Sequence, residues 1–315
     1  MNTPSVTISS ALPAPDRLDA DACIDIYQML RPIMPRYRPV SRHNYERLID
    51  ILDEVDALIL DGFGVINVGD RKIDNIDELL DACARAGKIV VVLTNGASHP
   101  SAKTSQKYNG WGLALTPEQV VSSRDAFEDV MARRPASQLI SLCGATTPLG
   151  SLSEVRFDDD DALWSDADGA VLLGTTSWNE TAHIRLEQFL RRGNRTLHIA
   201  NPDISAPHSD GFSDEPGYWA ARVMAAGLAE PSWYGKPHAP AFELAIRQVE
   251  LLAGRQVARE RIVMVGDSPH TDILGGNAAG LRTALITSYG LLRDHNADRL
   301  LDEIGIQPDF LVRRL

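Results

Sequence analysis

Two short apolar runs separated by a helical pattern stand out in the first third of the chain. Residues 57–60 (ALIL) and 89–93 (IVVVL) are apolar without alternation, as is typical of strands buried on both faces of a parallel sheet. Between them, the apolar residues of 74–87 (DNIDELLDACARAG) follow helical spacing, and Gly87 is placed to end that helix. Strand, helix and strand in this order predict a βαβ unit, and hence a parallel sheet with helices on its faces.

The same alternation returns near the C-terminus. A helix, a strand, a Gly/Ala-rich helix and two more strands are predicted there, at residues 239–253, 262–265, 272–280, 283–287 and 309–312. A middle block has its own strands at 139–144, 169–175 and 197–201, and its own helices near 180–192 and 216–227. The pattern predicts an α/β fold, a Rossmann-like doubly wound parallel sheet core with an inserted α/β domain.

This order divides the chain into four parts. They are an N-terminal tail with a helical extension (1–54), the first half of the core (55–135), the inserted domain (136–230) and the second half of the core (231–315).

Four segments outside the main pattern have simple interpretations. Residues 1–16 are rich in Ser, Thr and Pro and predict a loose tail, whereas residues 41–54 predict a helix. The basic stretch 30–43 and the acidic stretch 158–168 are most simply solvated segments.

Composition narrows the class of protein. The chain has 31 Lys and Arg against 43 Asp and Glu, so its net charge of −12 would repel nucleic acid and anionic membranes. It has no run of about 18 apolar residues, so no membrane span is predicted. Its three cysteines (Cys23, Cys83 and Cys143) lack metal-site spacing and suit a reducing compartment, and the N-terminus does not resemble a secretory signal. A cytoplasmic protein is predicted.

Chemically reactive side chains cluster where the predicted core strands end. Asp61 leaves the first strand in a Gly-containing turn, as a nucleophile or metal ligand would, and Thr94, Asn95 and Gly96 follow the second, a hydroxyl and backbone N–H groups suited to an anion. Later in the chain, Lys236 precedes a helix, and Asp267 and Asp272 follow the strand at 262–265. Carboxylates at two strand ends form the oxygen-rich kind of site that Mg²⁺ prefers.

Each of these residues alone has a plain structural alternative. A strand-end Asp or Thr is often only a helix cap, and a single Lys is usually solvent-facing. Their order along the chain, Asp, Thr, Lys beyond a cap-sized insertion, then GDxxxxD, is much more specific.

This order resembles the haloacid dehalogenase (HAD) superfamily of aspartate-nucleophile hydrolases, subclass IIA, which includes p-nitrophenyl, nucleotide and pyridoxal phosphate phosphatases. The resemblance covers about residues 55–312. The segments that carry the resemblance include LILDGFGVINVGDRKI, VVVLTNGAS, HIANPD, YGKPHAPAFELA and VGDSPHTDILGGNAAGLRTALITSYG.

The resemblance implies a role for each matched position. Asp61 would attack phosphorus to form an aspartyl-phosphate, while Thr94 and Lys236 hold and neutralise the phosphoryl group. Asp61, Asp267, Asp272 and the backbone carbonyl of Phe63 would hold Mg²⁺. Asn95, Gly96, Asn201 and Asp203 would contact the substrate, a small phosphorylated metabolite. The inserted domain would be a cap that selects the substrate, and the subclass allows a homodimer paired through its caps.

One position departs from the family pattern. Family phosphatases carry a second Asp two residues after the nucleophile, which protonates the leaving group, and here that residue is Phe63. Phenylalanine cannot transfer a proton, and such help is typically worth about 10²–10⁴-fold. We therefore expect weak or atypical phosphatase activity.

Three explanations of Phe63 stay open. The protein could cleave phosphates with good leaving groups or use another acid, for which His99, His208 and His270 are candidates. It could instead cleave a carbon–halogen or carbon–phosphorus bond. It could also bind a phosphometabolite with little turnover. The aromatic residues of the inserted domain either line a pocket or pack in its interior: Trp178, Tyr218, Trp219 and Trp233.

Overall fold

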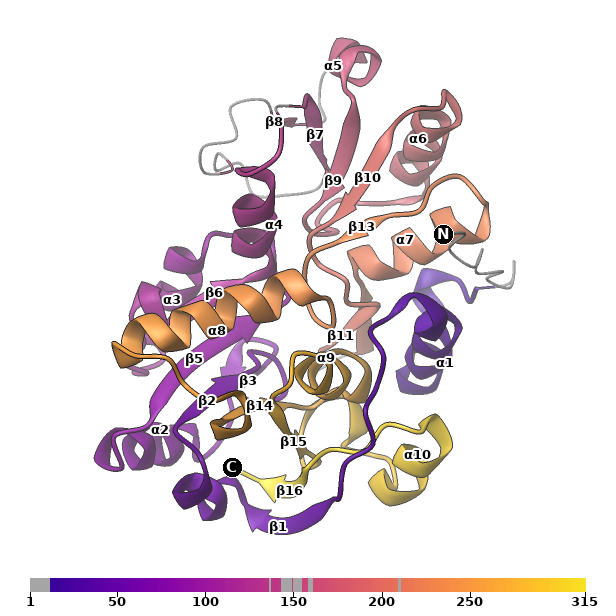
Figure 1. The fold of residues 1–315 in the computed structure, drawn as a ribbon. Helices are drawn as coiled ribbons and strands as arrows, with labels where there is room; N and C mark the ends of the chain where they lie inside the picture. The colour runs from indigo at the N-terminus through magenta and orange to yellow at the C-terminus, as the bar shows by residue number, and fades with distance from the viewer. Residues whose placement is uncertain (1–11, 136, 143–148, 150–154, 158–160, 209–210) are drawn as a thin grey trace.

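Two α/β modules make up the structure, a computed structural model that describes residues 12–135, 137–142, 149, 155–157, 161–208 and 211–315 (Figure 1). The larger module is the core. The smaller one, running from β7 (Leu139–Leu142) to β13 (Ser232–Trp233), is called the cap. None of the described helices has the length and apolar character needed to span a membrane.

The core is a seven-stranded sheet in which every pair of neighbouring strands is parallel. Its strands, in spatial order, are β1 (His43–Arg47), β16 (Phe310–Arg314), β15 (Arg282–Ile286), β14 (Ile262–Gly266), β2 (Ala57–Leu60), β5 (Ile89–Thr94) and β6 (Val120–Ser122). All five strands predicted for the core are present, which confirms the doubly wound α/β core.

Helices cover both faces of this sheet because its central strands present apolar residues to both sides. On β2, Leu58 and Leu60 pack on the same face as α2 (Ile76–Arg85). Ala57 and Ile59 pack on the opposite face, against α8 (Ala239–Ala253). The remaining core helices are α3 (Ser101–Gly110), α4 (Ser123–Met131), α9 (Leu274–Ala278) and α10 (Ala297–Ile304), with a small hairpin of β3 (Asn67–Val68) and β4 (Arg71–Lys72).

The chain leaves the core after α4, builds the cap, and returns through β13 to α8 (Figure 1). The cap sheet is parallel, with strands in the order β13 (Ser232–Trp233), β10 (Thr196–Ile199), β9 (Gly169–Leu172), β7 (Leu139–Leu142) and β8 (Val155–Phe157). Its helices are α5 (Asp161–Asp166), α6 (Glu180–Arg191) and α7 (Pro216–Ala225), and β11 (Ser205–His208) pairs with β12 (Gly211–Asp214). The inserted α/β cap is thus present, with all three of its predicted strands.

The helix predicted over residues 41–54 is wrong for its first half. Residues His43–Arg47 form β1, which pairs in parallel with β16 at the edge of the core sheet. Only Leu48–Glu54 is helical, as a 3-10 helix that buries Leu48 and Ile51. The free edge of β16 offers hydrogen-bond partners to this backbone, and no local sequence pattern announces such a distant partner.

Neither charged stretch is simply solvated. In the acidic stretch, Asp161–Asp166 is helix α5, because Trp164 packs against Phe189 of α6 at 5.5 Å between ring centroids. Residues 158–160 of that stretch lie outside the described residues. In the basic stretch, the Arg38 N–H donates to Asn277 Oδ1 (2.8 Å), so this segment is bound to the core.

The Gly/Ala-rich helix predicted over 272–280 starts earlier and is less regular than expected. A π-helical turn over Pro269–Ile273 precedes α9 (Leu274–Ala278). This wider turn carries Asp272, a predicted site residue.

A further helix, α1 (Ala20–Leu30), lies where the cap meets the core (Figure 1). Its buried residues share one apolar cluster with Trp219 and Ile204 of the cap and with Leu274 and Leu291 of the core. The loose tail predicted for 1–16 lies mostly outside the described residues, and Pro15–Arg17 forms one 3-10 turn.

Candidate functional site

The carboxyl ends of the central core strands bring the predicted site residues together. Asp61 follows β2, Thr94 ends β5 and Asp267 follows β14, and these strands are direct neighbours in the sheet order β14-β2-β5. Lys236 lies just before α8, and Asp272 lies in the turn before α9. The edge of a parallel sheet at its strand ends is where ligands of such folds bind.

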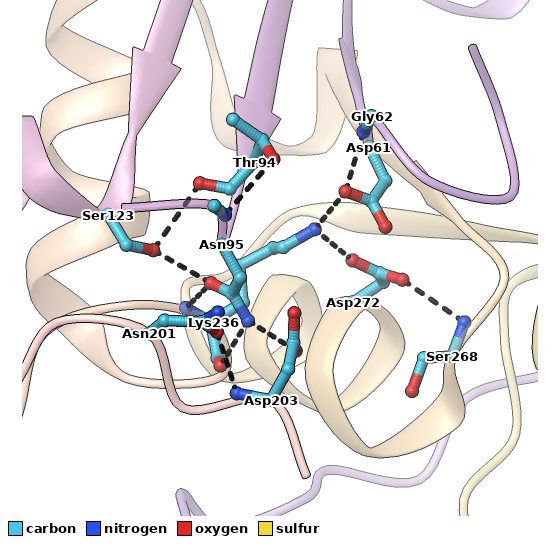
Figure 2. A network of polar contacts seen from close by, with 11 residues as sticks. Asp61, Gly62, Thr94, Asn95, Ser123, Asn201, Asp203, Lys236, Ser268 and Asp272 are labelled. Atoms are coloured by element: carbon cyan, nitrogen blue, oxygen red, sulfur yellow. Dashed lines mark hydrogen bonds and ion pairs between the residues drawn. The ribbon is translucent and has the colours of Figure 1, made fainter. Parts of the chain in front are cut away.

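Lys236 is the centre of the charge network (Figure 2). Its Nζ lies 2.6 Å from Asp61 Oδ1 and 2.7 Å from Asp272 Oδ1, and its side chain is 2% exposed. Burial alone would lower the pKa of Lys236, but the carboxylates of Asp272, Asp61 and Asp203 more than offset it and raise this pKa above its usual value. The ammonium therefore stays charged.

Three buried carboxylates, those of Asp61, Asp267 and Asp272, have ligand atoms within 4.8 Å of one another. Burial and repulsion from Asp272 raise the pKa of Asp61 well above its usual value and that of Asp267 to about 7. Two backbone donors hold the cluster: Leu291 N–H to Asp267 Oδ2 (2.7 Å) and Ser268 N–H to Asp272 Oδ2 (3.1 Å). Clustered buried carboxylates of raised pKa are a donor set that fits a hard divalent cation such as Mg²⁺.

Two glycines leave room for one of these carboxylates. A Cβ at Gly64 would lie 2.3 Å from Asp267 Cγ, and a Cβ at Gly290 would lie 1.6 Å from Asp267 Oδ2. Both glycines have positive φ, of 78° and 73°, which other residues rarely adopt. The backbone therefore forms a close cradle around Asp267 that no larger residue could form.

Asn95 connects the core to the cap (Figure 2). Its Nδ2 donates to Asp203 Oδ1 (2.7 Å) and to the Lys236 carbonyl (3.0 Å), while its Oδ1 accepts from Lys236 N–H (2.7 Å) and Ser123 Oγ (2.9 Å). Asn201 Oδ1 in turn accepts from Asp203 N–H (3.0 Å). These bonds fix Asp203, a cap residue, beside the carboxyl end of β5.

A cavity of about 170 Å³ opens at this junction. Eight of the ten predicted site residues line it, and the other two, Lys236 and Asp272, lie directly behind Asp61 in the ion-pair network. The lining residues are Cys23, Tyr27, Asp61, Phe63, Thr94, Asn95, Gly96, Asn201, Asp203, Ser205, Ala206, Glu215, Asp267, Ser268, Thr271 and Leu291.

Several lining residues were not predicted. Cys23 and Tyr27 come from α1, far outside the recognised motifs. Glu215 precedes α7, where an acidic residue is read as a helix cap and gives no signal of a site. Ser123 does not line the cavity, but it donates to Asn95 Oδ1, and its sequence context gives no signal of a site either.

Phe63 lines the cavity, so a phenyl ring stands where the family pattern has a carboxylate. Neither His99 nor His270 lines it. His99 is exposed, and His270 is fully buried, stacked on Tyr27, with its pKa lowered to about 3 by burial. These two histidines are not placed to replace the missing acid, and the side chain of His208 lies outside the described part of the chain.

The four aromatic residues singled out in the cap pack against other rings and do not line the cavity. Trp178, Tyr218 and Trp219 are buried, with the two tryptophan rings 6.3 Å apart, and Trp233 stacks on His238.

Comparison with known proteins agrees with this architecture. A family model described as Haloacid dehalogenase-like hydrolase matches residues 58–158, and one described as HAD-hydrolase-like matches residues 233–315. The chain belongs to the haloacid dehalogenase superfamily.

Several of its relatives are phosphatases. The chain is 26% identical over 235 residues to the dihydroxyacetone phosphatase of Corynebacterium glutamicum (strain R), covering 74% of this chain and 81% of that protein. It is 25% identical over 304 residues to the chloroplastic phosphoglycolate phosphatase 1A of Arabidopsis thaliana, covering 88% and 80%. The protein is thus a phosphatase-like hydrolase of the HAD superfamily.

Solved structures share its fold. A possible sugar phosphatase from Cytophaga hutchinsonii superposes with a TM-score of 0.76 at 22% identity, over 86% of this chain and 97% of that one. The p-nitrophenyl phosphatase from Archaeoglobus fulgidus superposes with a TM-score of 0.65 at 22% identity, over 82% and 96%.

Proposed function

We propose that the protein hydrolyses the phosphate monoester of a small metabolite through an aspartyl-phosphate on Asp61. The observation that carries this proposal is the position of Asp61: its carboxylate reaches the cavity, pairs with Lys236 at 2.6 Å and belongs to a three-carboxylate cluster. A nucleophile, a fixed cation and a metal-binding cluster are the parts that phosphoryl transfer requires.

The first chemical step forms a covalent intermediate. A carboxylate oxygen of Asp61 attacks phosphorus, the bond from phosphorus to the ester oxygen breaks, and the leaving group departs as an oxyanion that takes its proton from solvent. Lys236, held between Asp61 and Asp272, keeps its positive charge beside the reacting groups, and Thr94, whose Oγ1 accepts from Gly96 N–H (3.2 Å), offers its hydroxyl proton to a phosphoryl oxygen. Water then hydrolyses the aspartyl-phosphate, which restores Asp61 and releases phosphate.

Asp61, Asp267, Asp272 and the carbonyl of Phe63 would hold Mg²⁺. When bound, the cation supplies charge neutralisation for the phosphoryl group. The raised pKa values of Asp61 and Asp267 support this assignment. Burial and repulsion between the carboxylates disfavour their negative charges, and a bound cation would offset both effects.

Phe63 sets the limit on this chemistry. Its ring cannot protonate a leaving alkoxide, so leaving groups that need no proton, the phenolates of aryl phosphates and the carboxylates of acyl phosphates, are favoured over those of alkyl phosphates. We propose weak activity on alkyl phosphates for this reason.

The test is phosphate release from a panel of aryl, acyl, sugar and nucleotide phosphates, with Mg²⁺ and with EDTA, beside the Asp61→Asn variant. We expect metal-dependent release that Asp61→Asn abolishes. Phosphate release by Asp61→Asn would refute the role of Asp61 as the nucleophile. Equal release in EDTA and in Mg²⁺ would refute the requirement for a metal ion.

The other hypotheses keep separate tests. Halide release without metal would favour carbon–halogen chemistry, and thermal stabilisation by phosphometabolites without turnover would favour a binding protein. The buried carboxylate cluster supports the phosphatase instead, since displacing halide needs no cation. The cytoplasmic location, the homodimer paired through its caps and the boundaries at residues 136 and 230 stay predictions.

A further inference from the structure

The part of the cavity that the cap contributes is rich in hydrogen-bond acceptors. Its cap residues with polar side chains are Asn201, Asp203, Ser205 and Glu215. Among the described residues that line the cavity, none is a Lys, Arg or His, whereas four are acidic. The cation nearest to the reacting atoms, Lys236, is already bound to Asp61 and Asp272.

Glu215 is held by neutral partners. Its Oε2 accepts from Asn201 Nδ2 (3.0 Å), and its Oε1 accepts from Ser213 Oγ (2.9 Å). Asp203, on the other side of Asn201, is held by the Asn95 amide at 2.7 Å. Both cap carboxyl groups therefore line the cavity, and the hydrogen bonds that hold them come from amides and a hydroxyl; Asp203 also feels the charge of Lys236, whereas Glu215 has only neutral partners among the described residues.

The size of the cavity is limited by helix α1. Tyr27 is fixed from two sides, because its hydroxyl accepts from the Ile204 N–H of the cap (3.1 Å) and its ring stacks on His270 of the core at 5.1 Å. Cys23, one turn earlier, lines the same wall. This wall closes one side of the cavity, and a volume of about 170 Å³ favours a small group beside the phosphate. The Tyr27 hydroxyl still has its own proton to donate.

We propose that this cavity selects phosphate monoesters whose alcohol part is small, neutral and hydroxylated, that it disfavours alcohol parts carrying a carboxylate, and that Glu215 is a specificity-determining residue. The inference rests on the proposed function, since it requires the phosphoryl group to lie at Asp61. Hydroxyl groups of such a substrate would donate to the cap carboxylates, whereas a substrate carboxylate would meet like charge in a buried site, which is strongly unfavourable.

Two substrates isolate this difference. Glycerol 3-phosphate and phosphoglycolate both release a small alcohol from a CH₂–O–P linkage, but only the second places a carboxylate in the cavity. p-Nitrophenyl phosphate, with a good leaving group, reports on the catalytic centre itself. Burial raises the pKa of Glu215 to about 7, so assays at pH 8.5 keep this carboxyl ionised.

Glu215→Gln removes the charge and keeps a side chain that can still bond Asn201 and Ser213. Glu230→Gln is the matched control, because Glu230 is an exposed residue that follows α7 and makes the same charge change away from the cavity. We expect wild-type protein and Glu230→Gln to prefer glycerol 3-phosphate in kcat/KM, and Glu215→Gln to shift the ratio toward phosphoglycolate by about tenfold or more, the size expected for one like charge removed from a desolvated site.

The outcomes of these assays distinguish a failure of the proposed function from a failure of the proposed selectivity. No hydrolysis of any of the three compounds would refute the proposed function. Hydrolysis of p-nitrophenyl phosphate together with a preference for phosphoglycolate, or a ratio that Glu215→Gln does not change, would refute only the selectivity.

Binding provides a readout that does not require turnover. Calorimetry with Asp61→Asn in Mg²⁺ should show tighter binding of glycerol 3-phosphate than of phosphoglycolate, and adding Glu215→Gln should reduce or reverse that order. The reverse order in Asp61→Asn alone would overturn the inference even if the protein proved inactive.

Discussion

Replacing Lys236 with Met should destabilise the protein strongly at pH 8 and much less at pH 5. The ammonium lies 2.6 Å from Asp61 Oδ1 and 2.7 Å from Asp272 Oδ1, in a side chain that is 2% exposed. At an effective dielectric constant of about 20, each such pair attracts by about 6 kcal/mol, most of which offsets the desolvation of the charges. Removing Lys236 leaves the buried carboxylates without a compensating charge, which should lower the free energy of unfolding by about 3–5 kcal/mol.

The pH dependence follows from the carboxyl groups left behind. Even beside Lys236, burial and repulsion hold the pKa of Asp61 well above its usual value, and loss of the ammonium raises it further. A carboxyl with a higher pKa in the folded than in the unfolded state binds more protons when folded. The free energy of unfolding of Lys236→Met therefore falls as pH rises from about 4, the unfolded value, through the folded pKa.

Chemical denaturation in EDTA, at pH 5 and at pH 8, measures the difference. The control is Lys72→Met, which removes an exposed ion pair at 2.7 Å to Asp77 and should change stability by about 0–1 kcal/mol at both pH values. Mg²⁺ should restore more stability to Lys236→Met than it adds to the wild type, because it supplies the missing positive charge. A loss as small as that of Lys72→Met, or one equal at the two pH values, would refute the electrostatic account of this site.

Three further changes test other parts of the structure. Phe63→Asp should raise turnover of alkyl phosphates by about 10²-fold or more, and that of aryl or acyl phosphates much less, in phosphate-release assays; equal gains would contradict the missing-acid account. Gly290→Ala, whose Cβ would lie 1.6 Å from Asp267 Oδ2, should raise the Mg²⁺ concentration needed for half-maximal activity, whereas Gly305→Ala, with φ of 69° and open space around it, should not. Tyr27→Phe should lower the free energy of unfolding by about 1–3 kcal/mol, measured by urea denaturation, because a cap N–H loses its acceptor; an unchanged midpoint would exclude that role.

The core of the fold was readable from local pattern. The unbroken apolar runs at 57–60 and 89–93 can be buried only in a sheet covered on both faces, and they form β2 and β5. The edge strand β1 was misread as a helix, because its residues are mixed in polarity and its pairing with β16 joins segments more than 260 residues apart. Helix α5 was missed because one buried tryptophan outweighs its acidic neighbours.

The candidate site likewise contains residues that the sequence indicated and contacts that it did not. Asp61, Thr94 and Asp267 were found because strand ends in a parallel sheet converge, and this convergence follows from the strand pattern alone. Lys236 was found through its motif, but nothing local shows that it binds Asp61 and Asp272 at once. That shared contact depends on where the chain returns from the cap.

By itself, the sequence determined the class of fold and the family, and it indicated the groups that we propose to react, together with Phe63 two residues after Asp61. These depend on periodicity along a short segment and on motifs at strand ends, where neighbours in sequence are neighbours in space. Only the tertiary structure decided the walls of the cavity. Tyr27 and Glu215 lie nearly 190 residues apart on surfaces with no local signal, and they come to line one cavity because α1 packs where the cap meets the core.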